Sequence, residues 1–78
     1  MWKTQGFGGI VMKVSYKKLW VILAHKEISK ADLRKNTGIS PTTFTKINRN
    51  EIVALNVLIK ICLYLDCEIG DIIEIVRD

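Results

Sequence analysis

Two helix-start signals only eleven residues apart, with a glycine between them, constrain this chain more than any other feature. Ser29 opens the first as part of an S-x-x-D capping box, whose side chains accept hydrogen bonds from free backbone N–H groups. Ser40 opens the second and is followed by proline, which loses no hydrogen bond at the first helical position. Gly38 can adopt the positive φ that ends a helix. The sequence therefore predicts two short helices, over residues 30–36 and 41–48, joined by a tight turn.

Apolar residues at helical spacing predict a further helix on each side of this pair. The helix before it begins after a Ser15 cap and runs to about Lys26. Its apolar stripe is formed by Tyr16, Leu19, Trp20 and Leu23. The helix after the pair is longer, and its stripe makes it the expected centre of the core. That stripe is formed by Leu55, Leu58, Ile59, Cys62 and Leu65.

The ends of this longer helix carry weaker signals. Ala54 stands where a serine or threonine would cap the helix better, so we expect Asn50 or water to satisfy its free N–H groups. Residues 69–73 then predict a short helix with an extended end. The segment Ile72–Val76 holds too many apolar residues for a free tail. It either closes the core or pairs with a second subunit.

Length and composition bound the fold class. The 78 residues, 49% of them hydrophobic, leave room for one compact domain. With five helical segments they predict an all-α, five-helix bundle over residues 15–76, with short terminal β segments, such as Ile10–Val14, as an option. No apolar run approaches the roughly 20 residues that a membrane helix needs. Two cysteines are too few for a disulfide scaffold, so we expect a cytoplasmic protein.

Charge is divided unevenly along the chain. Residues 1–50 hold ten basic and two acidic residues, a net charge of +8. Residues 51–78 hold two basic and six acidic residues, a net charge of −4. This polarity favours a surface that faces a polyanion while the acidic end is kept away from it. Chance clustering on a solvated surface is the alternative, and charge alone does not separate the two.

The central pair of helices carries the strongest functional signal. Two short helices joined by a glycine turn, the second opening with small hydroxyl residues, form a helix-turn-helix. In such a motif the first helix lies across the DNA backbone, and the N-terminal end of the second enters the major groove. Threonine can hydrogen-bond a base edge and place its methyl group on thymine, and lysine can donate to guanine. We therefore expect residues 41–48 to read DNA.

The stretch from Ile28 to Asn50 resembles the lambda-repressor-like (Cro-type, or XRE) helix-turn-helix family, with Leu33, Gly38 and Ile39 among its packing and turn positions. The resemblance covers about residues 15–76, because the apolar positions of the last two helices also match. It implies five short helices, sequence-specific binding to double-stranded DNA, frequent homodimers on palindromic operators, and transcriptional control, usually repression.

The same resemblance implies the site residues. Base contacts are expected from Pro41, Thr42, Thr43, Thr45 and Lys46. Contacts to phosphate or sugar are expected from Lys30, Arg34, Ser40, Asn48, Arg49 and Asn50. Two residues depart from the family pattern. Lys30 replaces the common glutamine, and Arg34 replaces an alanine at a close helix contact, so its stem must lie along the interface while its head reaches solvent or phosphate.

Residues 1–14 are interpreted as an N-terminal arm. A Gly8-Gly9 pair just upstream of Met12 fits a ribosome-binding sequence in the coding DNA, so Met12 is a candidate natural start. The competing interpretation is an arm that reaches into a DNA groove or a partner, for which Trp2 and Lys3 are suitable residues.

Other reactive side chains have structural explanations. His25 has no serine or cysteine near it in the sequence, so we assign it no catalytic role. Cys62 and Cys67 are expected to be core thiols, since no CxxC or Cys/His quartet is present. The acidic residues of 66–74 lack the order of a calcium loop, and the N-terminal glycines lack the context of a phosphate-binding loop. No cofactor or metal is expected.

These observations predict a non-enzymatic, homodimeric transcriptional regulator that represses by occupying its operator. The first alternative is a protein-interaction module, such as an antitoxin with secondary DNA binding, whose apolar C-terminal end binds a partner. The second alternative is a nonspecific or RNA-binding protein.

Overall fold

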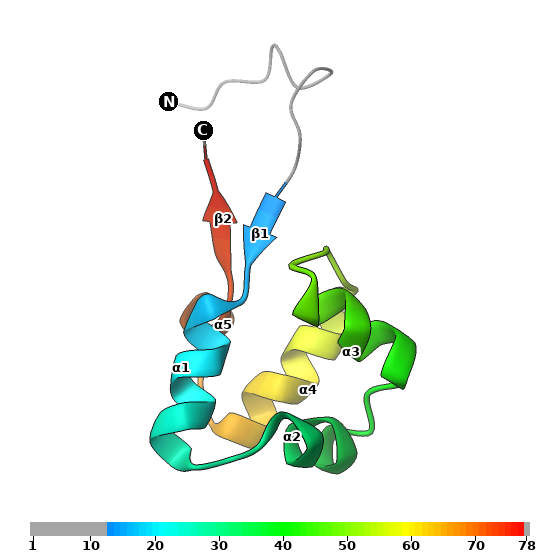
Figure 1. Ribbon diagram of the computed structural model, residues 1–78. Coiled ribbons are helices and arrows are strands. Elements are labelled where there is room, and N and C mark those ends of the chain that lie inside the picture. Colours follow the sequence, from blue (N-terminus) through cyan, green and yellow to red (C-terminus); the bar gives the residue numbers. More distant parts are fainter. Residues whose placement is uncertain (1–12, 78) are drawn as a thin grey trace.

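The computed structural model describes residues 13–77, which form five helices and two short strands. In chain order these are β1 (Lys13–Ser15), α1 (Lys17–Lys26), α2 (Lys30–Thr37), α3 (Pro41–Asn48), α4 (Leu55–Leu65), α5 (Ile69–Ile72) and β2 (Glu74–Val76). Helix α4 runs through the middle of the bundle, with α1 on one side and α2 and α3 around the other (Figure 1). The predicted all-α, five-helix class is confirmed.

The two strands join the ends of the described chain. β1 and β2 are antiparallel, and Val14 lies opposite Ile75. Ser15 lies opposite Glu74, so pairing holds Ser15 in the strand, and the prediction that it is the N-cap of α1 is wrong. The N-cap is Tyr16, although the Ser15 hydroxyl oxygen still accepts a hydrogen bond from the Lys17 N–H at 3.2 Å. Residues 10–12 of the optional strand, and most of the predicted arm over 1–14, lie outside the described residues.

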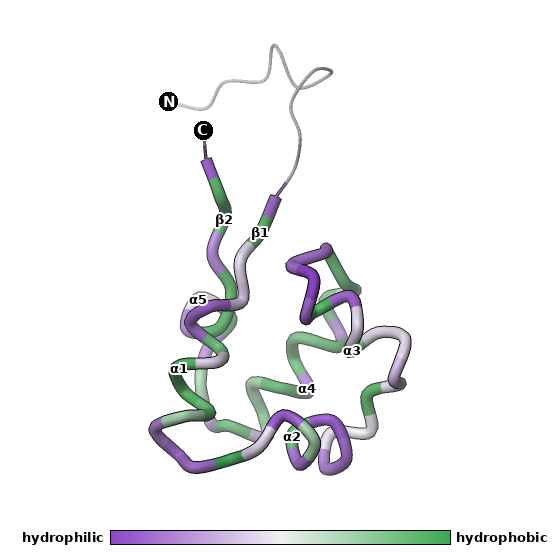
Figure 2. The backbone as a smooth tube through the Cα atoms, viewed as in Figure 1, coloured by the Kyte–Doolittle hydropathy of each residue, from purple (hydrophilic) through white to green (hydrophobic). Residues whose placement is uncertain are grey.

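The core follows the predicted stripes except on α4. Figure 2 shows α4 as mostly hydrophobic and α2 as largely hydrophilic. The buried face of α4 consists of Leu58, Ile61, Cys62 and Leu65. Leu55 and Ile59, predicted to be core residues, are 61% and 44% exposed. Because most residues of α4 are apolar, its sequence does not indicate which side of the helix is buried. Packing against α2 and α5 determines the buried side. The predicted apolar stripe therefore included two residues, Leu55 and Ile59, that face solvent.

The serine caps of α2 and α3 are confirmed, but only half of the capping box predicted at Ser29 is present, because within residues 13–77 the Asp32 side chain accepts no hydrogen bond from the Ser29 N–H. The Ser29 hydroxyl accepts a hydrogen bond from the Asp32 N–H at 3.0 Å, and the Ser40 hydroxyl accepts one from the Thr43 N–H at 3.2 Å. Gly38 is the C-cap of α2, as predicted, with φ of 72°. The helix ends at Thr37, one residue later than predicted. Each serine side chain satisfies one of the N–H groups that the start of a helix leaves without an intrahelical partner.

Tyr16 connects the start of α1 to the segment between α3 and α4. Its N–H donates to Asn50 Oδ1 at 3.1 Å, and its hydroxyl donates to the Glu51 carbonyl at 2.7 Å. The Asn50 side chain, expected to help cap α4, therefore binds the N–H of Tyr16, the residue just before α1. Ala54 provides no side-chain cap to α4, as its chemistry predicts.

The C-terminal segment divides its apolar residues between two environments. Ile72, at the end of α5, is fully buried and closes the core. Ile75 and Val76, in β2, are 65% and 41% exposed. Of the two expectations for this segment, core closure therefore holds for Ile72, while the strand residues are open to solvent.

The two cysteines are core thiols, as predicted. Cys62 is buried and Cys67 half-buried, and both are free. Burial is the main cause that raises the pKa of the Cys62 thiol from 9.0 to about 11, and the neighbouring Cys67 thiol raises it further. Among residues 13–77, no cluster of three or more histidine, cysteine or acidic side chains is suited to hold a metal ion. Within the same range, no helix has the length and apolar character needed to span a membrane.

We expect Gly38→Ala to lower the free energy of unfolding by about 1–2 kcal/mol, because alanine is strained at a left-handed φ. Urea unfolding measures this change. Gly70→Ala is the matched control, since a Cβ there also meets open space and its φ is not left-handed. The control should raise stability by about 0.5 kcal/mol. Equal losses in the two variants would contradict the assigned role of the turn.

Alkylation of the folded protein at pH 8 should modify Cys67 well before Cys62. The thiolate is the reactive form, and burial keeps the Cys62 thiol protonated up to its pKa of about 11. Peptide mass analysis after a short exposure to iodoacetamide measures both sites. Protein unfolded in urea, in which the two thiols should react at similar rates, is the control. Faster modification of Cys62 in the folded state would show that this thiol is accessible.

Candidate nucleic-acid interface

Helix α3 buries one side and exposes the other. Phe44 and Ile47 lie in the core, 8% and 0% exposed. Thr42, Lys46 and Arg49 follow one another at helical spacing on the opposite side, and all three are exposed. Pro41, Thr45 and Asn48 form a second exposed row beside them. The structure thus brings four of the five predicted base-contact residues to one open surface, with Thr43 half-buried at its edge.

Hydrogen bonds distinguish the threonines of this surface. The Ser40 hydroxyl donates to Thr43 Oγ1 at 3.0 Å, so Thr43 takes part in the cap of α3. The Thr45 hydroxyl donates to the Pro41 carbonyl at 2.9 Å and keeps only its acceptor capacity for an outside group. Within residues 13–77, Thr42 and Lys46 have no side-chain hydrogen bond or ion pair. These two side chains can therefore give their full hydrogen-bonding capacity to a ligand.

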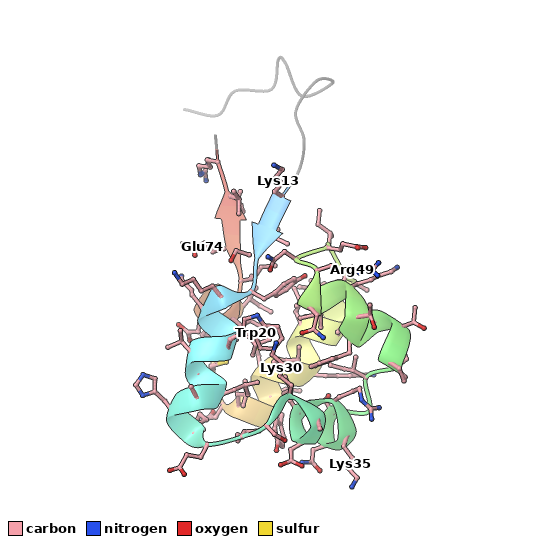
Figure 3. All side chains as sticks on the ribbon, in the orientation of Figure 1. Lys13, Trp20, Lys30, Lys35, Arg49 and Glu74 are labelled. Atoms are coloured by element: carbon pink, nitrogen blue, oxygen red, sulfur yellow. The ribbon has the colours of Figure 1, made fainter. Side chains whose placement is uncertain are left out.

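Lys30, predicted to contact phosphate, lies where α1, α2 and α3 meet. Its ammonium donates to Asn48 Oδ1 at 3.1 Å. The same ammonium lies 4.0 Å from the centroid of the Trp20 ring, within cation–π range (Figure 3). Two of the predicted backbone-contact residues thus bind each other, and the ammonium keeps two further protons for an outside acceptor.

The remaining predicted backbone-contact residues lie in different environments. The Arg49 side chain is 71% exposed and points outward from the end of α3 (Figure 3), with a weak 4.0 Å contact to Glu51. Arg34 is half-buried on α2, as the departure from the family pattern predicts. Asn50 has φ of 59°, and its side-chain oxygen is bound to the Tyr16 N–H. Only its amide N–H₂ remains free to reach outward.

Acidic residues lie at the far end of the bundle from α3. Asp66, Asp71 and Glu74 border an open groove along α1, opposite three lysines. These lysines are Lys17, Lys18 and Lys26. The Lys18 ammonium donates to the Gly70 carbonyl at 3.0 Å and ties α1 to α5. This end therefore carries mixed charge, whereas the outer face of α3 carries only positive charge.

Sequence reasoning missed two contacts that shape this surface. The interaction of Trp20 with Lys30 and the hydrogen bond from Tyr16 to Asn50 join residues on different elements. Local patterns such as caps and apolar stripes do not report on such contacts. The sequence placed Trp20 in the apolar stripe of its helix, which indicated core packing and gave no sign of a contact with Lys30.

Comparison with known proteins finds a matching family and a similar solved structure. The family of Cro/C1-type helix-turn-helix DNA-binding domains matches residues 18–78. Among solved structures, the crystal structure of the transcriptional regulator VanUg, Form II, is similar, with a TM-score of 0.87 and 43% sequence identity. That similarity covers 99% of this chain and 100% of the other. A search of curated proteins finds no match.

Proposed function

We propose that this chain, which belongs to the family of Cro/C1-type helix-turn-helix DNA-binding domains, is a repressor that recognises a specific double-stranded DNA sequence and acts by occupying it. The family is a DNA-binding one and not a class of enzymes. The observation that supports sequence recognition best is the outer face of α3, where Thr42 and Lys46 are exposed and have no side-chain partner among residues 13–77.

The proposed contacts divide into two groups. Base edges are read by Pro41, Thr42, Thr43, Thr45 and Lys46. Phosphate and sugar are held by Lys30, Arg34, Ser40, Asn48, Arg49 and Asn50. The first group supplies small groups that approach bases closely, with hydroxyls that donate or accept, methyls that pack on thymine, and an ammonium that donates to guanine. The second group supplies affinity that depends on salt but carries little sequence information.

We further propose that the protein acts as a homodimer in the cytoplasm. One helix-turn-helix in a chain of 78 residues makes few base contacts, and a two-fold dimer doubles them. The two recognition helices would then lie about 34 Å apart, one turn of DNA. The exposed Ile75 and Val76 of β2 are available for subunit contact, whereas Ile72 is used in the core.

The second candidate function is a protein-interaction module, such as an antitoxin, with DNA binding as a secondary property. It is favoured by apolar side chains that lie exposed along and just before α4. These are Ile52, Leu55, Ile59 and Leu63, which are 54%, 61%, 44% and 78% exposed. Stable co-purification with the product of a neighbouring gene would favour this candidate.

Selection from a random duplex library at physiological salt tests the proposed function. Protein beginning at Met1 and protein beginning at Met12 are used in parallel. Enrichment of a palindrome with half-sites one turn apart is the expected result. Folded protein that enriches no sequence would contradict the proposal and favour the second candidate.

The double variant Thr42→Ala/Lys46→Ala should lose roughly tenfold or more of its preference for the selected duplex over random duplex. The reason is that both side chains are proposed to contact base edges. Competition binding at two salt concentrations measures the preference and the salt dependence together.

Two single variants are the controls for this experiment. Arg49→Ala should weaken binding to both duplexes alike and lower the salt slope by about one, as expected for a lost phosphate contact. Lys26→Ala removes the same charge on the groove side of α1 and should leave the preference and the affinity for the selected duplex close to wild type. Unchanged preference in the double variant would contradict the assignment of the base contacts.

A further inference from the structure

Trp20 of α1 contacts α3 both directly and through Lys30. Its indole meets the Phe44 ring edge-to-face, with ring centroids 6.2 Å apart and planes at 67°. The Lys30 ammonium lies 4.0 Å from the centroid of an indole ring and donates to Asn48 Oδ1 at 3.1 Å. Phe44 and Asn48 are four residues apart, so they lie one turn apart along the same side of α3. Trp20 is thus the common member of two contacts to this helix.

Two contacts one turn apart restrict a helix more than one contact does. Ile47 anchors α3 in the core, and the two contacts through Trp20 add restraint along a neighbouring side, which opposes rotation of the helix about its axis and pivoting. Thr42 and Lys46 project from the opposite side of α3, so any rotation displaces them sideways. Hydrogen bonds weaken steeply when their geometry departs from about 2.7–3.2 Å and near-linear alignment. Base recognition therefore depends on how firmly the inner side of α3 is held.

We propose that Trp20 is a positioning residue for sequence discrimination: it orients α3 through Phe44 and Lys30 without touching DNA. The inference rests on the proposed function, because it concerns the same face of α3. A preorganised side-chain set loses less free energy on binding its correct partner than a mobile one. Trp20 accordingly affects the difference between selected and random DNA, whereas any change in the phosphate contact of Lys30 affects both duplexes alike.

The contacts of Trp20 differ from those of an ordinary core residue. Leu19 and Leu23 supply the buried apolar surface of α1, at 0% and 3% exposure, while Trp20 is only half-buried. A leucine at position 20 would keep apolar contact with the core. It would offer no aromatic face to the Lys30 ammonium and no ring to meet Phe44. Substitution at position 20 can therefore separate the effect on discrimination between DNA sequences from the effect on the free energy of unfolding.

The test compares Trp20→Leu with Trp20→Phe, using the selected duplex and random duplex at two salt concentrations. In Trp20→Leu the ratio of the two affinities should fall roughly tenfold, the discrimination typical of a base contact, while random-duplex affinity falls by no more than the loss seen in Lys30→Met, which removes the phosphate contact itself. Trp20→Phe keeps an aromatic face and should retain most of the ratio. Leu23→Val is the stability control, because it loosens the core of α1 away from the two α3 contacts.

Lys30→Met breaks the same contact from the other side and provides a second test should Trp20→Leu fail to fold. It should lower the affinity ratio and, because Lys30 is also a proposed phosphate contact, weaken binding to both duplexes. Its effect on the ratio should be smaller when Trp20 is already leucine, because both substitutions act through one contact. Three results would overturn the positioning role. The first is an unchanged affinity ratio in Trp20→Leu or Lys30→Met. The others are additive losses in the double variant and an equal loss of the ratio in Leu23→Val. Wild-type protein that does not discriminate would overturn the proposed function and this inference together.

Discussion

The two hydrogen bonds of Tyr16 hold together segments that the chain itself keeps far apart. Tyr16 is fully buried between β1 and α1, and it binds Asn50 and Glu51 beyond the end of α3. Burial raises the pKa of its phenol, so the hydroxyl remains a hydrogen-bond donor at ordinary pH. Because Asn50 is also held in a left-handed conformation, the chain leaves α3 along a fixed path. The position of α4, and the apolar core that it centres, depends on this connection.

Helices as short as α2 and α3 need such outside support. Each has eight residues, below the length at which an isolated helix is stable in water. Serine caps satisfy N–H groups at their starts, and Leu33 and Ile47 are buried completely. The recognition motif is therefore a property of the whole bundle and does not form by itself. This agrees with a family match that extends over residues 18–78, well beyond the two helices of the motif.

Most features of the fold that depend on residues close together in the sequence were predicted correctly. Features that depend on contacts between distant segments were not. The Ser29 and Ser40 caps and the Gly38 turn were all predictable, because each depends on residues within one helical turn. The face of α4 was not, since Leu55 and Ile59 are as apolar as the residues that are buried. For the candidate site, exposure of the α3 residues followed from periodicity. The partners of Lys30 and Asn50 did not, because they lie 18 and 34 positions away.

A division of labour within α3 follows from these contacts. Side chains on its outer side, such as Thr42, take no part in the core, so their replacement costs the bundle little stability and, under the proposed function, changes the sequence recognised. Side chains on its inner side, such as Phe44, are bound to α1 and cannot change without moving the helix. A chain of this size has too small a core to tolerate repeated changes on the inner side. New specificity can therefore arise on the outer side while the inner contacts keep the helix in place.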